Sequence, residues 1–301
     1  MKLAIFGLGK MGGNMARRLC RSGIEVVGYN RSSDITETLA KEEGLIPAYT
    51  VDEAIAKLTG RRLIWLMLPS GAPTEEMIQT LIPKLKAGDI IIDGGNSNYH
   101  DTQRRHTLLD KHKIHYMDAG TSGGVWGLEN GYCMMVGGSQ EDFAAIKPII
   151  QALAPGKDHG WAHVGPCGAG HFTKMIHNGI EYGMMQAMAE GFALMKGKEE
   201  FNIDLANVAE IWRHGSVVRS WLLDLTADFL KNDQKLDDIK PFVADSGEGR
   251  WTCVEAIDQG VSAPVLSLSI HARFASQGKA DFGNKMLSKM RNAFGGHAIK
   301  K

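Results

Sequence analysis

The chain has 301 residues, which is enough for two domains that each bury a hydrophobic core. Lysine plus arginine and aspartate plus glutamate both number 34, and this balance argues against nucleic acid or an anionic membrane as the main partner. The four cysteines have neither metal-ligand spacing nor the density of a disulfide framework. We expect reduced thiols and no bound metal.

The start of the chain argues against a leader peptide. Met1 runs directly into the apolar segment 3–6 and then into glycines, which leaves no room for the charged and apolar regions of a signal sequence. No apolar run approaches the ~18 residues that are needed to span a bilayer. We therefore expect a soluble, cytoplasmic protein.

A glycine-rich turn follows the first predicted strand, residues 3–6, and precedes a predicted helix over residues 11–21. This is the position where the pattern G-x-G-x-x-G binds the pyrophosphate of a dinucleotide, because the glycines allow a tight turn, a close backbone approach and close helix packing. Free amides at the start of the helix would hold the phosphates. The predicted cofactor contacts in this turn are Gly7, Leu8, Gly9, Lys10, Met11 and Gly12.

The end of the second predicted strand, residues 24–29, indicates which dinucleotide binds. Asn30, Arg31 and Ser32 follow it, about 20 residues past the glycines, where the side chain that reads the adenosine ribose is expected. An acidic residue there would repel a 2′-phosphate, whereas this chain offers an amide, a guanidinium and a hydroxyl. We expect these three residues to contact NADP, with NAD possible. The alternative is that Arg31 is a solvated loop residue without a ligand.

Further strands are predicted over residues 63–68, 90–93 and 115–118, each followed by glycine and small polar residues. Alternating strands and helices predict a largely parallel, doubly wound sheet of the Rossmann type, whose ligands bind beyond the carboxyl ends of the strands. The turn with Asn96 and the turn Ser122-Gly123-Gly124 should therefore face the same crevice as the first turn. Glycine turns without a ligand are also common.

Strand patterns end near residues 165–170, and helical patterns fill the remainder. The predicted helices cover residues 203–213, 217–230, 252–259, 267–276 and 282–293, after a first one that includes 170–183. We expect an NAD(P)-binding domain over residues 1–167 and an all-helical domain over residues 168–301 for substrate binding, catalysis and oligomerisation.

The first of these helices carries a cation, an imidazole, an amide and a carboxylate on one face. The spacing is i, i+3, i+4 and i+7 for Lys174, His177, Asn178 and Glu181. An apolar row on another side predicts that much of the helix is buried. This row contains Phe172, Ile176, Ile180, Met184 and Met188. Burying lysine and glutamate together is costly unless they are paired or functional, which favours a catalytic pocket over an ordinary exposed charge pair.

Residues 174–183, Lys-Met-Ile-His-Asn-Gly-Ile-Glu-Tyr-Gly, resemble the signature of the 6-phosphogluconate dehydrogenase family, and the chain is similar to its short form. The resemblance implies oxidative decarboxylation of 6-phosphogluconate to ribulose 5-phosphate and CO2, with Lys174 as base and then acid, and Glu181 as the acid that protonates the enediol. Asn96 would lie near both cofactor and substrate. The other implied substrate contacts are Ser122, Gly123, Gly124, His177, Asn178, Tyr182, Arg250, Arg273, Arg291 and His297.

The C-terminal segment also resembles the family. Arg291 and His297 match a tail motif that reaches into a neighbouring subunit's active site, which implies a homo-oligomer, a dimer or a tetramer, in which the tail acts in trans or, if the geometry differs, in cis. Two positions depart from the long form. Pro69-Ser70-Gly71 replaces a lysine-containing turn near the cofactor, and Arg250 stands where lysine is usual.

Two other interpretations remain. A β-hydroxyacid dehydrogenase that acts on a small unphosphorylated hydroxy acid would share the two-domain plan and a lysine on the same helix. Such an enzyme has no reason to keep His177, Glu181, Arg250 and the tail together. A dehydrogenase fold that serves only as a sensor or scaffold would be expected to lack Lys174 or Glu181, and both are present.

Overall fold

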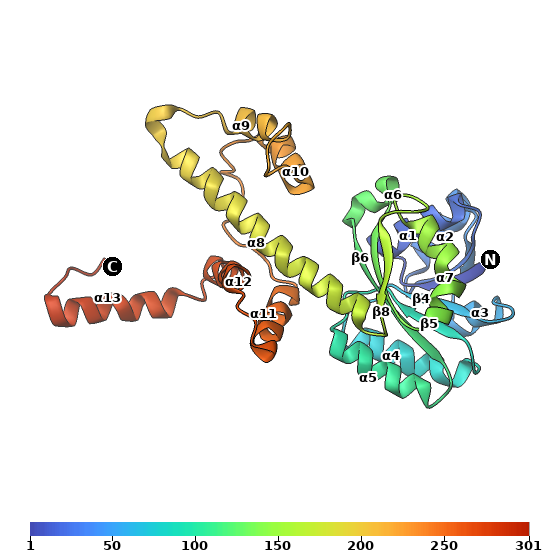
Figure 1. Ribbon diagram of the computed structural model, residues 1–301. Coiled ribbons are helices and arrows are strands. Elements are labelled where there is room, and N and C mark those ends of the chain that lie inside the picture. Colours follow the sequence, from blue (N-terminus) through green and yellow to red (C-terminus); the bar gives the residue numbers. More distant parts are fainter. Residues whose placement is uncertain (301) are drawn as a thin grey trace. The chain divides into compact units, whose positions relative to one another are not determined.

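The computed structural model describes residues 1–300, and the chain divides into two compact units, Met1–Met175 and a second that begins at Ile176. The first unit is built on one eight-stranded sheet with the order β3-β2-β1-β4-β5-β6-β7-β8 (Figure 1). Its strands are β1 (Lys2–Phe6), β2 (Glu25–Tyr29), β3 (Ile46–Ala48), β4 (Leu63–Leu66), β5 (Ile90–Asp93), β6 (His115–Ser122), β7 (Cys133–Gly137) and β8 (Trp161–Gly165). All neighbouring strands are parallel except β6 and β7. The predicted doubly wound fold is confirmed.

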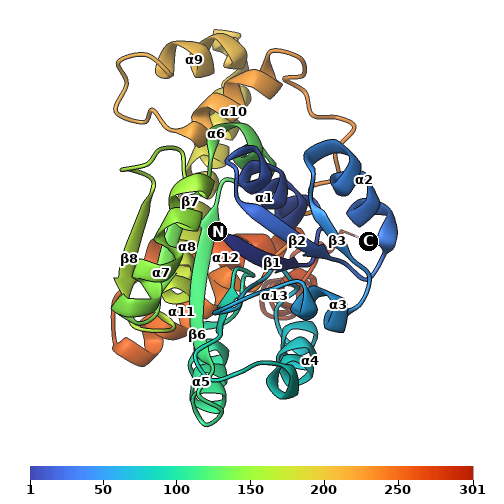
Figure 2. The same ribbon diagram turned by 90° about the vertical axis from the view of Figure 1, so that its right-hand side faces the viewer.

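Helices cover both faces of this sheet (Figures 1 and 2). They are α1 (Lys10–Arg21), α2 (Ser33–Glu43), α3 (Val51–Ala56), α4 (Ala72–Leu81), α5 (Tyr99–Asp110), the short α6 (Gly127–Asn130) and α7 (Gln140–Leu153), with single turns η1 (Ile82–Lys84) and η2 (Gly124–Trp126). Alternate residues of each strand serve the two faces. Leu3 and Ile5 of β1 pack with α1, α2 and α7, while Ala4 and Phe6 pack with α3, α4 and α5.

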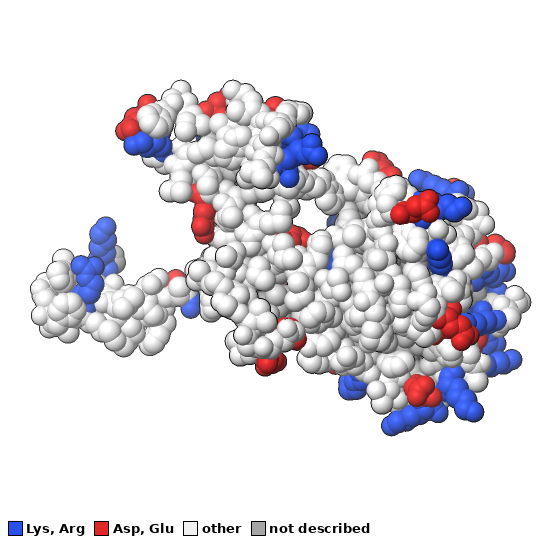
Figure 3. All heavy atoms as spheres, viewed as in Figure 1, with Lys and Arg blue, Asp and Glu red and all other residues white. Residues whose placement is uncertain are grey.

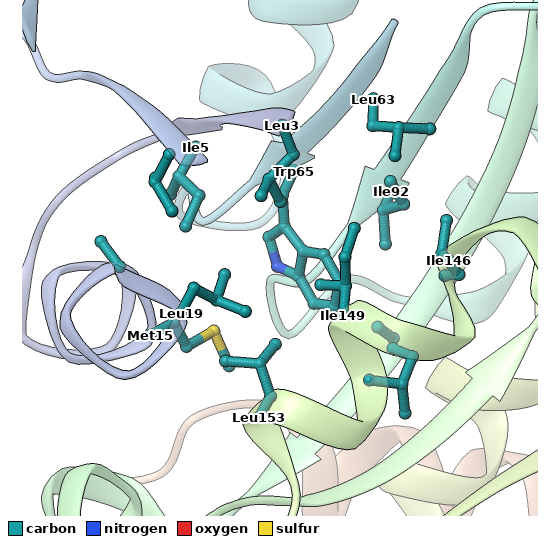
Figure 4. Close-up of a cluster of buried hydrophobic side chains, with 14 of the residues drawn as sticks. Leu3, Ile5, Met15, Leu19, Leu63, Trp65, Ile92, Ile146, Ile149 and Leu153 are labelled. Carbon is teal, nitrogen blue, oxygen red and sulfur yellow. The ribbon is translucent and has the colours of Figure 1, made fainter. Parts of the chain in front are cut away.

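The cluster on the first face contains Trp65, the largest fully buried side chain (Figure 4). Trp65 of β4 lies among residues from β1, β5, α1 and α7, and is almost fully buried. Strands that are covered on both sides are apolar at nearly every position, which is why β1, β4 and β5 appear in the sequence as apolar runs that only Lys2 at the start of β1 and the buried Asp93 at the end of β5 depart from. This core fixes the carboxyl ends of the strands, where the candidate site residues lie.

The second unit is helical, as predicted. Helix α8 (Ala169–Gly197) begins in the first unit and continues into the second. It is followed by η3 (Glu199–Phe201), α9 (Leu205–Trp212), α10 (Trp221–Leu230), α11 (Glu248–Gln259), α12 (Pro264–Ser276) and α13 (Asp281–Gly295). Helices α9 and α10 start later than predicted, because Asp204 and Ser220 accept hydrogen bonds from the first-turn amides and cap both helices.

The predicted burial of the apolar row on α8 is wrong at two positions, since Ile180 and Met184 are 49% and 40% exposed. The reason lies in which side of α8 the other helices cover. α11 and α12 pack against Gly179 and Gly183, where a side chain would meet Thr252 or Val265. The neighbouring row that contains Ile180 and Met184 is therefore left open in the single chain.

On the side of the molecule drawn in Figure 3, acidic and basic side chains of the first unit are interspersed and neither sign of charge dominates. Within residues 1–300, no helix combines the length and the apolar character that a membrane crossing requires.

Candidate active site

The turn between β1 and α1 has the backbone geometry of an anion site. Gly7 has a φ of 97°, and a Cβ there would collide with the carbonyl of Met67, while a Cβ at Gly12 would collide with the carbonyl of Gly7. Gly9 is the N-cap of α1, has open space where a side chain would be, and is followed by a first turn without acidic residues. The amides at this helix start can donate hydrogen bonds to a pyrophosphate. The residues of this turn therefore fit the dinucleotide that the sequence predicts.

Asn30 connects this turn to the predicted ribose-binding loop. Its side-chain oxygen accepts a hydrogen bond from the Leu8 amide at 3.0 Å, and its amide nitrogen donates to the Ser32 carbonyl at 3.1 Å. Arg31 and Ser32 are exposed beside it. The structure therefore brings together the two predicted cofactor segments, residues 7–12 and 30–32. Asn30 holds them in place through its side chain, a role that its position in the sequence does not indicate. Its direct contact with the cofactor stays a prediction.

The substrate turns lie at the same edge of the sheet, because β1, β2, β5 and β6 all run parallel. Asn96 is exposed between the buried Gly95 and Ser97. β6 is longer than predicted and ends at Ser122, which is therefore a strand residue and not part of the turn; the turn itself begins at Gly123 and Gly124. Asn14 of α1 donates to the Val125 carbonyl at 3.3 Å, which ties this turn to the helix after the glycine turn.

Lys174 lies near the start of α8 and is 6% exposed, as its predicted role requires. It is packed against β6, where a Cβ at Gly120 would be only 2.5 Å from the Lys174 Cβ. Asp118, on the same strand, accepts hydrogen bonds from the Gly168 and His171 amides, both at 2.7 Å. These bonds satisfy the His171 amide in the first turn of α8 and the Gly168 amide just before it, and so fix the segment that precedes Lys174.

Asp118 is a site residue that the sequence analysis missed. It is fully buried, and the only signal for it is an acidic residue at the end of a predicted apolar strand. Its charge also acts on a neighbouring cysteine. Burial, and then the Asp118 carboxylate, raises the pKa of the Cys167 thiol far above its usual range. Cys167 therefore stays a neutral thiol and is no nucleophile.

In the second unit, α8 presents His177, Asn178 and Glu181. The His177 Nδ1 lies 3.1 Å from the Asn178 Oδ1 and 3.9 Å from the nearest Glu181 carboxylate oxygen. The side chain of Glu181 is 40% exposed in the single chain, so its predicted burial is wrong here. The uncovered side of α8 described above accounts for this. The imidazole thus lies between an amide and a carboxylate, and all three residues are partly exposed.

A second group of candidate ligand-binding side chains lies around residues 244–246. The Arg273 guanidinium lies over the Tyr182 ring, 3.4 Å from its centroid, and donates to the Ala244 carbonyl at 2.9 Å. The Tyr182 hydroxyl is 3.1 Å from the Ser246 hydroxyl, and Arg250 forms an ion pair with Asp245. The structure therefore gathers the predicted phosphate ligands Tyr182, Arg250 and Arg273 in one place. Two guanidinium groups and a phenol suit a dianionic phosphate.

Arg291 and His297 are placed differently. Both are exposed, and α13, which carries Arg291, has no buried residue and extends away from α11 and α12 (Figure 1). The side-chain amide of Asn292 donates to the His297 carbonyl at 2.9 Å, so the tail is folded locally. Within the described residues 1–300 of one chain, the tail stands apart from the group around Tyr182.

The glycine turn, the doubly wound sheet and the helical unit after it place the chain in the class of two-domain NAD(P)-binding dehydrogenases. Within that class, the chain belongs to the 6-phosphogluconate dehydrogenase family. Residues 2–165 match the model for the NAD binding domain of 6-phosphogluconate dehydrogenase, and residues 170–300 match the model for its C-terminal domain. The predicted family is confirmed.

Named relatives of the chain belong to the same family. The NAD(+)-dependent, decarboxylating 6-phosphogluconate dehydrogenase of Haloferax volcanii is 37% identical, over 99% of this chain and 98% of its own length. The Plasmodium falciparum 6-phosphogluconate dehydrogenase, solved with NADP+ and with 6-phosphogluconate, is 31% identical and superposes with a TM-score of 0.85. The chain is covered completely and spans 66% of that longer protein. The 3-hydroxyisobutyrate dehydrogenase of Mycobacterium tuberculosis, at 23% identity and a TM-score of 0.73, shares the fold.

Proposed function

We propose that the protein oxidises and decarboxylates 6-phosphogluconate to ribulose 5-phosphate and CO2 with reduction of NADP or NAD. The observation that carries this proposal is the family segment on α8, with Lys174 buried against the strand that ends at Ser122. The grouping of Tyr182, Arg250 and Arg273 supports a phosphorylated substrate over a small unphosphorylated acid.

The cofactor would be held by the amides around Gly9 and by the loop of Arg31 and Ser32. When bound, its nicotinamide supplies the hydride acceptor for the C3 carbon of the substrate. The chain's own contribution is to orient both reactants and to exclude water. Met11, half-buried at the start of α1, is the residue expected to pack on the nicotinamide ring.

Lys174 moves the protons in this proposal. As a neutral amine it takes the proton of the C3 hydroxyl while C3 is oxidised, and it becomes an ammonium group. The product of that step is a β-keto acid, which loses CO2 readily when an acid stabilises the developing enolate oxygen. The Lys174 ammonium returns its proton to that oxygen. Glu181 then protonates C1 of the enediol, while His177 and Asn178 orient the substrate hydroxyls and carboxylate.

Association of several copies of the chain would add the tail residues to the active site. We propose a homo-oligomer, a dimer or a tetramer, in which Arg291 and His297 of one copy act in the active site of another. The support is the exposed apolar surface of the tail helix, where Phe282 and Phe294 are 77% and 79% exposed in the single chain. Such a surface is typical of an interface.

The function is tested by incubating the purified protein with 6-phosphogluconate and following reduced cofactor and CO2, with NADP and NAD in parallel. One CO2 should appear for each reduced cofactor. Gluconate, which lacks the phosphate, and 3-hydroxyisobutyrate serve as matched substrates that should react poorly. Turnover of 3-hydroxyisobutyrate in preference to 6-phosphogluconate would favour the β-hydroxyacid dehydrogenase alternative.

Cofactor preference gives a separate prediction. Arg31→Asp should weaken NADP binding by about tenfold or more and leave NAD binding within about threefold, because attraction to the 2′-phosphate becomes repulsion. Dissociation constants for both cofactors, measured by titration, check this. The control is Arg21→Asp at the end of α1, an exposed arginine that is paired with Glu43. Equal losses for NADP and NAD would show that Arg31 does not discriminate between them.

A further inference from the structure

A buried carboxylate accepts hydrogen bonds from the residues on both sides of Asn96. Asp93, at the end of β5, accepts a hydrogen bond from the Gly95 amide at 3.1 Å and another from the Ser97 hydroxyl at 2.7 Å. Asp93 is fully buried and Ser97 is 3% exposed, whereas Asn96 between Gly95 and Ser97 is open to solvent. The conformation of this turn is therefore set by the buried side chains of Asp93 and Ser97.

Arg105 of α5 holds that carboxylate in turn, and is 1% exposed. One end of its guanidinium donates to Asp93 at 3.4 Å and to the Ser97 hydroxyl at 3.2 Å. The other nitrogens donate to the Gly71 carbonyl at 3.3 Å and to Glu75 at 3.1 Å. Because Gly71 ends the turn after β4, a single side chain connects the turns that follow β4 and β5.

The two carboxylates that bind Arg105, Asp93 and Glu75, also accept hydrogen bonds from other residues. The Tyr116 hydroxyl donates to Asp93 at 2.9 Å, and burial, followed by the charge of Asp93, raises the pKa of Tyr116, so the phenol remains a donor. Hydrogen bonds from Arg104 and then Arg105 hold the pKa of Glu75 at about 2. A buried ion pair is weak evidence for stability, because apolar residues of similar volume often serve as well. A planar, multiply bonded guanidinium is better explained by the geometry that it imposes.

We propose that Asp93, Ser97 and Arg105 are positioning residues that set the turn of Asn96, so that the Asn96 amide meets substrate and nicotinamide in a fixed orientation. This inference rests on the proposed function, which places Asn96 against both ligands. All three are almost fully buried. Their effect on catalysis passes through Asn96, and this is the feature that distinguishes positioning from a merely structural role.

A double-mutant cycle tests the inference, with Asn96→Ala as the common partner. Ser97→Ala and Arg105→Lys should each lower kcat/KM for 6-phosphogluconate by about tenfold when Asn96 is present and by no more than about twofold in the Asn96→Ala background. Arg104→Lys is the matched control. Arg104 is the preceding residue of α5, forms an ion pair with the same Glu75 at 2.7 Å, and is 54% exposed. It should change kcat/KM by no more than about twofold in either background.

The same cycle is measured in the dissociation constant of the reduced cofactor, by fluorescence titration. This second readout does not depend on the identity of the substrate, so it decides the inference even if 6-phosphogluconate is not turned over. Ser97→Ala removes one hydroxyl and decides the matter if Arg105→Lys fails to fold. Losses that are equal with and without the Asn96 side chain in both readouts, or the absence of any loss, would overturn the proposal.

Discussion

Replacing Lys174 by methionine is expected to lower kcat for oxidation of 6-phosphogluconate by about 10³-fold or more, with cofactor affinity nearly unchanged. One side chain is proposed to act as base in the oxidation and as acid in the decarboxylation, so both steps should fail together. Methionine has a similar length and fills the buried position against Gly120 without a charge. Stopped assays for CO2 and for reduced cofactor, together with a cofactor titration, measure the effect.

Two further variants make this result specific. Lys174→Arg keeps a cation that cannot act as a base near neutral pH, so it should be as inactive as Lys174→Met if proton transfer is the role. Lys196→Met makes the same change in the last turn of α8, where the ammonium donates to the Lys235 carbonyl, and should leave kcat unchanged. Residual kcat of Lys174→Met within about tenfold of the unaltered protein would contradict the assignment.

The sequence predicts those parts of the fold that have a strong local pattern. β1, β4 and β5 are buried on both faces and therefore appear as runs of apolar residues, with a charged residue only at the first position of β1 and the last of β5. β3 was missed because it has three residues with a proline among them, and β8 because its residues are only partly buried. The extension of β6 through Ser122 depends on pairing with the antiparallel β7, which is a property of the folded sheet and not of the segment itself.

The site was predictable to the extent that its residues lie on helices or in turns with fixed spacing. The i, i+3, i+4 and i+7 pattern locates Lys174 and Glu181 on α8, and the glycine spacing locates the start of α1. Residues that act through tertiary contacts leave no such pattern. Asp118 meets the start of α8 across 50 residues or more of sequence, and Arg105 reaches Gly71 across 34. Exposure of Glu181 also could not be predicted, because it depends on which side of α8 the later helices cover.

The tail prediction concerns assembly. A protein with Arg291→Ala and His297→Ala should be inactive or nearly so, and so should Lys174→Met, yet a mixture of the two should recover activity. If tails are exchanged between two copies, a mixed dimer contains one pocket with an intact lysine and a donated intact tail. Random exchange at equal amounts would then restore about a quarter of the activity of the unaltered protein, because half of the dimers are mixed and half of their sites are complete.

The exposed state of the tail in the single chain is what makes this outcome the expected one. α13 has no buried residue and carries Phe282 and Phe294 on its surface, so it offers apolar area that a second copy can bury. The matched control is the Arg291→Ala, His297→Ala protein mixed with a Lys174→Met chain that also carries both tail changes, and this mixture should stay inactive. Subunit exchange is verified separately with two affinity tags. Failure to recover activity while exchange is demonstrated would mean that each tail serves its own subunit or has no part in the active site.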